Sequence, residues 1–102
     1  MNTRTITVAL ILMLAIPVMA AKPDGALYKS KCASCHGADG AGTTPVGKSM
    51  KIRDLRAPEV QKQTDIELTK LIAGGKGKMP AYGKQLSTAQ IEGLIAYIRT
   101  LK

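Results

Sequence analysis

The chain has 102 residues, enough for one small domain, and its 15 lysines and arginines against 7 acidic residues give a formal net charge of +8. It contains no phenylalanine, no tryptophan and only three tyrosines. Because large rings fill most cores of this size, the protein needs another source of apolar bulk, and the scarcity of stacking side chains argues against a nucleic-acid-binding class despite the positive charge.

A charged start and an apolar run give the first 20 residues the pattern of a secretory signal peptide. Arg4 precedes a mostly apolar stretch from Ile6 to Ala21 that ends in small residues, as in cleavable signals. The stretch is shorter than the ~20 residues that a transmembrane helix needs, and an uncleaved anchor is the alternative. We expect cleavage after Ala20, export to the periplasm, and residues 21–102 as one domain without stable membrane insertion.

The first element of the mature chain is expected to be a helix from about Asp24 to Ser34, with Asp24 as its N-cap. Its far end carries the sequence CASCH at residues 32–36, which contains both cysteines and the only histidine. Two thiols three positions apart, followed at once by a histidine, form the pattern of covalent haem attachment. Cys32 and Cys35 would add to the two vinyl groups, and His36 would be an axial ligand of the iron.

A redox disulfide and a zinc site are the alternatives for this motif. A thioredoxin-type disulfide belongs in a βαβ context, and this chain has no strand-rich pattern. Structural zinc takes four ligands, whereas the chain has only three Cys and His side chains. The motif therefore predicts one covalent haem c, with its iron, as the cofactor. A buried porphyrin would also supply the apolar bulk that the sequence lacks.

The middle of the chain is expected to be less regular than its ends. Residues 37–50 are rich in Gly, Ala and Thr and are expected to form a loop. A short helix is expected from Pro58 to Lys62, because proline suits the first helical turn. Tyr28 and Tyr97 are expected in the core where the first and last helices meet. Since no strand signal is present, the predicted fold class is all-α.

Two longer helices have capping boxes at their starts. Thr64 with Glu67 opens the first, which is expected to end at Gly74, and Ser87 with Gln90 opens the last helix. Apolar residues at three- and four-residue steps predict that each helix buries one face. The expected apolar residues are Ile66, Leu68, Leu71 and Ile72 in the first helix, and Ile91, Leu94, Ile95, Ile98 and Leu101 in the last.

A low-spin electron carrier needs a second axial ligand, and methionine is the ligand that favours reduced iron. Beyond the signal, the chain has only Met50 and Met79. Met79 lies in the sequence GGKGKMP at 74–80, where glycines let the backbone approach a planar cofactor and Pro80 stiffens the chain. Met79 is therefore the expected ligand and Met50 the alternative, although either could instead fill a gap in a core.

Four segments together resemble short bacterial class I c-type cytochromes: GALY at 25–28, CASCHG at 32–37, GKMPAY at 77–82 and IAYIR at 95–99. The resemblance implies a compact cytochrome c fold, with three to four helices wrapped around one covalently bound haem and the N- and C-terminal helices packed across each other. It also implies His/Met ligation and one-electron transfer. In the family a proline carbonyl often accepts the other N–H of the ligand histidine, and Pro45 is the closest match here.

The predicted function is that of a soluble periplasmic electron carrier between redox partner proteins, monomeric and not an enzyme. Its basic residues would steer docking to an acidic partner, and nucleic acid is not expected as a partner. The rival class is a haem enzyme or a gas or peroxide sensor, which needs an open iron site or a displaceable Met79. The basic residues near the expected haem segments are Lys29, Lys31, Lys48, Lys51, Arg53, Lys76, Lys78 and Lys84.

Overall fold

The computed structural model describes residues 9–11 and 21–102. The signal peptide expected over residues 1–20 lies outside these residues except for 9–11, so it stays a prediction. The described part contains six α-helices and no strand, only an isolated bridge between Lys76 and Met79. This confirms the all-α fold class. No helix in the described ranges is long and apolar enough to cross a membrane.

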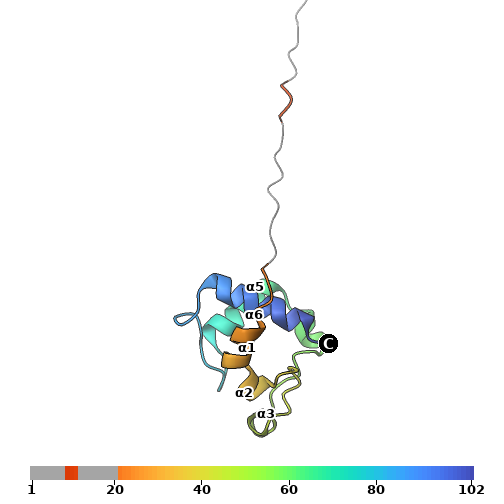
Figure 1. The fold of residues 1–102 in the computed structure, drawn as a ribbon, viewed down its shortest axis with the longest axis vertical. Helices are drawn as coiled ribbons and strands as arrows, with labels where there is room; N and C mark the ends of the chain where they lie inside the picture. The colour runs from red at the N-terminus through yellow and green to blue at the C-terminus, as the bar shows by residue number, and fades with distance from the viewer. Residues whose placement is uncertain (1–8, 12–20) are drawn as a thin grey trace, which may run out of the picture.

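Figure 1 shows α3 at the far end of the folded domain from α5 and α6. In chain order the helices are α1 (Gly25–Lys31), α2 (Ala33–His36), α3 (Pro45–Met50), α4 (Pro58–Gln61), α5 (Asp65–Gly74) and α6 (Thr88–Thr100).

The first predicted helix is broken at Cys32 and continues as a separate short helix. The Asp24 carboxylate accepts from the Leu27 N–H at 3.0 Å, which confirms the expected N-cap. The prediction of one helix to Ser34 is wrong, because α1 ends at Lys31 and α2 begins at Ala33, with Cys32 between them at φ −115° and ψ −34°. Its carbonyl accepts from both Cys35 N and His36 N, at 3.2 and 2.9 Å.

The segment predicted as a loop contains α3, so that prediction is wrong over residues 45–50. The Thr44 hydroxyl accepts from Gly47 N at 2.9 Å, and Pro45 occupies the first helical turn. The same hydroxyl donates to the Cys35 carbonyl at 2.8 Å and so fastens α3 to α2. The glycine content hid this helix, because Gly47 is needed for close packing and not for a turn.

Replacing Gly47 with alanine is expected to destabilise the holoprotein by about 1–3 kcal/mol, the cost of overpacking a tight contact. A Cβ there would lie 2.6 Å from the Cys35 carbonyl oxygen and still closer to that of Gly42. Urea unfolding measures the change. Gly74→Ala is the matched control, because no atom lies within 4 Å of its added Cβ. Equal stability of the two variants would contradict the packing argument.

The other predicted helices are confirmed as α4, α5 and α6. Both capping boxes are present, Thr64 with Glu67 and Ser87 with Gln90. In α5, Leu68 and Ile72 are buried as expected. The expectation for Ile66 is wrong, because its side chain is 69% exposed. Ile66 lies two positions before Leu68, roughly 200° away around the helix, so the two side chains are on different faces of α5.

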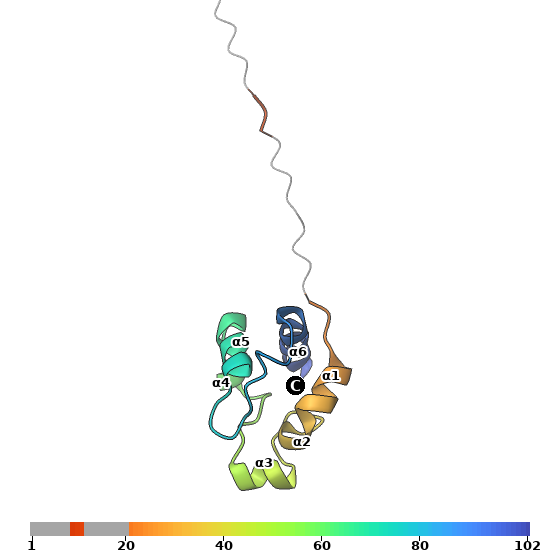
Figure 2. The same ribbon diagram turned by 90° about the vertical axis from the view of Figure 1, so that its left-hand side faces the viewer.

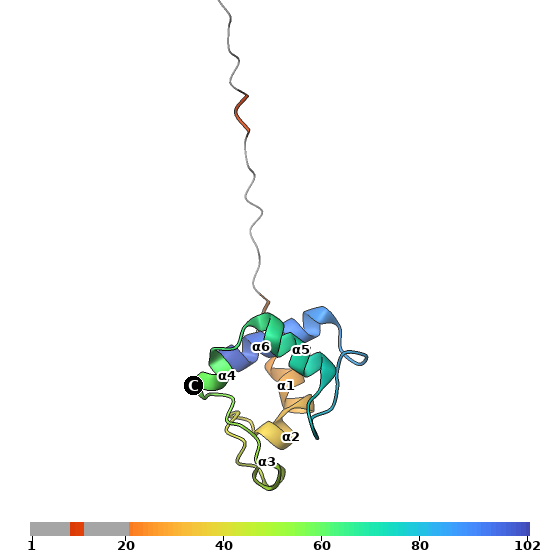
Figure 3. The same ribbon diagram turned by 180° about the vertical axis from the view of Figure 1, so that it is seen from behind.

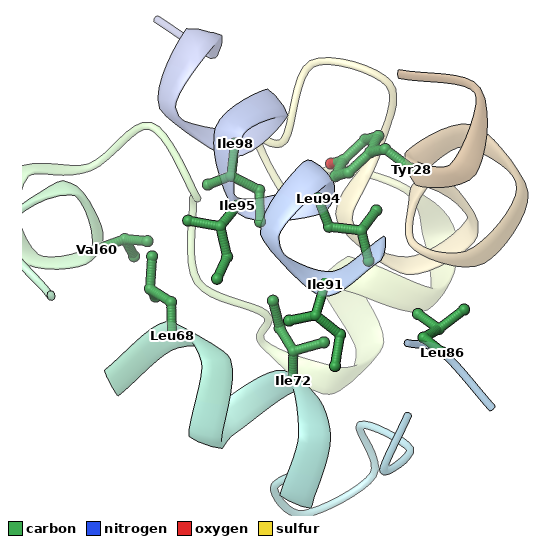
Figure 4. Close-up of a cluster of buried hydrophobic side chains, with 9 residues drawn as sticks. All are labelled: Tyr28, Val60, Leu68, Ile72, Leu86, Ile91, Leu94, Ile95 and Ile98. Atoms are coloured by element: carbon green, nitrogen blue, oxygen red, sulfur yellow. The ribbon is translucent and has the colours of Figure 1, made fainter. Parts of the chain in front are cut away.

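Nine buried apolar side chains form one core, in which residues of α5 point toward those of α6 (Figure 4). Tyr28 of α1 is fully buried and its ring centroid lies 4.8 Å from that of Tyr97, which is half-buried. The Asp24 N–H donates to the Gly93 carbonyl at 3.0 Å. The expected meeting of the first and last helices is therefore confirmed. The core consists of Tyr28, Val60, Leu68, Ile72, Leu86, Ile91, Leu94, Ile95 and Ile98.

A polar clamp joins the end of α6 to the segment between α4 and α5. The Arg99 guanidinium donates to the carbonyls of Gln61 and Gln63 at 2.8 and 2.5 Å, and to the Asp65 carboxylate at 2.8 Å. The Gln61 side chain in turn donates to the Ile98 carbonyl at 3.2 Å. These bonds fix α4 and the start of α5 against α6.

Candidate haem site

An apolar cavity is lined by residues of α1, α2, α5 and α6. Figure 2 shows α1 and α2 on one side of the molecule and α5 on the other. The cavity itself has a volume of about 50 Å³, and about 500 Å³ of empty space, open solvent included, lies in and around it. Three of the predicted site residues line it, namely Cys32, His36 and Met79. The other lining residues are Tyr28, Leu55, Val60, Leu68, Leu71, Ile72, Tyr82, Leu94 and Ile98.

His36, the last residue of α2, presents its imidazole to this cavity. Its Nδ1 atom is buried and has no hydrogen-bond partner among the described residues. Buried side-chain nitrogens in proteins are normally paired, so His36 differs from a satisfied core histidine. Burial also lowers the pKa of His36 below its ordinary value, which favours the neutral imidazole that binds metals.

The two cysteines are free thiols and occupy different positions relative to the cavity. Cys32 lines it, at the break between α1 and α2. Burial, together with the nearby Cys35, raises the pKa of the Cys32 thiol to about 11, so Cys32 is protonated at neutral pH. Cys35 is half-buried on α2 and is not among the lining residues.

Met79 reaches the cavity from a tightly folded segment, residues 75–83, which we call the Met79 strap. Lys76 and Met79 exchange two backbone hydrogen bonds of 3.2 and 2.9 Å. Gly75 has φ +71°, and a Cβ there would lie 2.7 Å from the Met79 carbonyl oxygen. The strap therefore needs glycine at this position. The alternative ligand, Met50, is half-buried at the end of α3 and does not line the cavity.

Sequence and structure comparisons identify the family. Residues 20–98 match the family model described as cytochrome c oxidase, cbb3-type, subunit III. Cytochrome c6 of Leptolyngbya boryana is 33% identical over 78 residues, which cover 76% of this chain and 88% of that protein. The chain belongs to the c-type cytochromes. The predicted family is thereby confirmed, and with it haem c and its iron as the cofactor.

Other relatives of this c-type cytochrome agree in fold and differ in length. The solved structure of the KustC0563 c-type cytochrome has a TM-score of 0.72 and 27% identity, and the match covers 78% of this chain and 98% of that one. The cbb3-type cytochrome c oxidase subunit FixP of Azorhizobium caulinodans is 32% identical over 82 residues, 80% of this chain. The chain spans only 27% of FixP.

The residues around the cavity fit a haem. Its wall is built of apolar side chains, and the potential ligands His36 and Met79 come from segments far apart in the sequence. One expectation is not met, because Pro45 gives His36 no acceptor. Pro45 begins α3, and no described residue, Pro45 included, makes a hydrogen bond with Nδ1.

Tyr82 is a cavity residue to which sequence analysis gave no role. Its half-buried ring lines the cavity, and its hydroxyl donates to the Lys31 carbonyl at 3.2 Å. Burial raises the pKa of Tyr82 above its ordinary value, and the nearby Cys32 and Cys35 add to this. The one sequence signal was its place in GKMPAY, which shows resemblance but carries no information on contacts.

Proposed function

We propose that this c-type cytochrome is a periplasmic electron carrier in which Cys32 and Cys35 tether the haem and His36 and Met79 bind its iron. The proposal rests on one observation: Cys32, His36 and Met79, from both ends of the domain, line a single apolar cavity. Haem-based electron transfer itself follows from the family. The proposal adds the ligands, the tethers and the location.

The haem iron supplies one-electron redox chemistry, and the protein supplies a fixed environment for it. His36 would bind as a neutral imidazole, and Met79 would donate a thioether that favours reduced iron. The apolar wall would limit the water around the haem, and two protein ligands held by packed segments would keep rearrangement between oxidation states small. The signal-like N-terminus supports export, where a haem bond would keep both thiols from forming a disulfide.

The rival function, a haem enzyme or a gas or peroxide sensor, is separated from the carrier by a spectroscopic experiment. The ferric holoprotein of a carrier should show a Met–Fe charge-transfer band and no spectral shift when cyanide is added at low concentration. An immediate shift would indicate an open or weakly held sixth position and would favour the rival. The chain has a single histidine, so a second histidine cannot close the site.

Electron transfer to redox partner proteins is expected to depend on exposed lysines near the Met79 strap. Lys31, Lys76, Lys78 and Lys84 are all exposed, and Lys31 lies beside Tyr82 through the hydroxyl bond. We infer an acidic docking surface on the partner and a monomeric carrier. Positive charge around the redox centre would raise the association rate at low salt.

The rate of electron transfer to an acidic redox protein is therefore expected to fall several-fold between about 0.01 M and 0.15 M salt, as the Debye length shrinks from about 30 to about 8 Å. Lys78→Gln should lower the low-salt rate about two-fold. Lys62→Gln is the matched control, since Lys62 follows α4, on the side of the molecule away from the strap (Figure 3). Stopped-flow kinetics measures both, and a rate independent of salt would contradict docking by charge.

A further inference from the structure

Among the residues that the structure describes, the Met79 strap makes several backbone hydrogen bonds with α5 but only one hydrogen bond with α1 and α2, the helices on the side of His36. Beyond the Lys76–Met79 bonds, Tyr82 N donates to the Ile72 carbonyl at 3.0 Å and Gly83 N to the Ala73 carbonyl at 3.1 Å. Every backbone hydrogen bond from the strap to another element therefore ends on α5. The strap could swing away from α2 without breaking any of them.

One hydrogen bond crosses to the other side of the cavity. The Tyr82 hydroxyl donates to the Lys31 carbonyl at 3.2 Å, over a sequence separation of 51 residues. In the described part of the chain, no other hydrogen bond links the strap to α1 or α2.

The acceptor of this bond is available because of the break in the first helix. Lys31 is the last residue of α1, so its carbonyl has no N–H partner within that helix. The next residue, Cys32, lines the cavity together with Tyr82. The bond therefore joins two walls of the cavity directly beside a proposed haem tether.

We propose that the Tyr82 hydroxyl is a latch that holds the Met79 strap against the end of α1 and thereby keeps the iron's sixth position closed. The inference rests on the proposed Met79 ligation. Tyr82 is a positioning residue, because it acts through the segment that carries Met79. With Met79 as a ligand of the iron, an external ligand would enter only when the strap opens, so the opening frequency of the strap would set the rate of ligand entry.

Tyr82→Phe tests the latch, since it removes the hydroxyl and keeps the ring in the cavity wall. The ferric holoprotein of this variant should bind cyanide about two- to five-fold faster than the wild type, the size expected for one exposed hydrogen bond. Hydrogen–deuterium exchange should become faster in residues 75–83 and stay unchanged in α6. Both measurements use the full mature holoprotein.

Tyr97→Phe is the matched control, because it removes the same atom from a half-buried tyrosine whose hydroxyl makes no hydrogen bond with the described residues. Equal cyanide rates and equal strap exchange in Tyr82→Phe and wild type would overturn the latch. So would faster exchange throughout the chain, or the same change in Tyr97→Phe. If the wild type itself lacks the Met–Fe band, the ligand proposal fails separately, and strap exchange alone then decides for or against the latch.

Discussion

Replacing Met79 with alanine is expected to abolish the Met–Fe charge-transfer band and to open the iron to external ligands. A thioether ligand raises the haem potential, so its loss should lower the potential by on the order of 0.2 V, within the roughly 0.8 V that axial ligands span. Cyanide should then bind at once. Visible spectroscopy and a redox titration of the purified holoprotein measure these changes.

Met50→Ala is the control for this prediction. Met50 is half-buried at the end of α3 and does not line the cavity, so its removal should leave the band and the potential unchanged. An unaltered spectrum in Met79→Ala would show that Met79 is not the ligand. Loss of the band in Met50→Ala would then identify Met50 as the ligand.

The mature chain without haem is expected to be largely unfolded and to show no cooperative thermal transition. Six of the nine core side chains also line the cavity, so the core and the cofactor site are one region. Without the porphyrin these side chains lose the contacts that would fill one side of each. A domain of this size has little other apolar burial to compensate.

The double variant Cys32→Ala/Cys35→Ala can form no thioether, and a preparation of it that shows no haem absorbance provides the haem-free chain. Its thermal melt by far-ultraviolet circular dichroism is compared with that of the holoprotein. Cys35→Ala should behave differently, because Cys32 lines the cavity and can still form one tether. A sharp transition in the double variant would show that the chain folds without the cofactor.

The elements that the sequence predicted well have local start signals. The capping boxes at Thr64 and Ser87 fixed α5 and α6 to within a residue, because both partners lie within one turn of each other. A local start signal was also present before α3, where the N-cap Thr44 is followed by Pro45. The surrounding glycines nevertheless favoured the prediction of a loop. Sequence alone does not distinguish a glycine that permits a turn from one, such as Gly47, that permits close packing.

The residues of the candidate site could be proposed from the sequence, but their geometry could not. The motif at 32–36 and the strap methionine could be recognised from residue type and spacing. The break at Cys32, the cavity position of Cys32 in contrast to Cys35, and the bond from Tyr82 to Lys31 could not. Each depends on segments that meet only after the chain has folded, and so does the exposure of Ile66.

The clamp at the end of α6 constrains the side chains at positions 63 and 99 very unequally, although the two residues are hydrogen-bonded to each other. Arg99 holds Gln63 only through its main-chain carbonyl, a group that every amino acid supplies. The clamp therefore places no demand on the side chain at position 63, whereas a change at position 99 removes all three anchors together. Selection on this clamp should therefore act on Arg99 and only weakly on residue 63, whose main-chain carbonyl Arg99 binds.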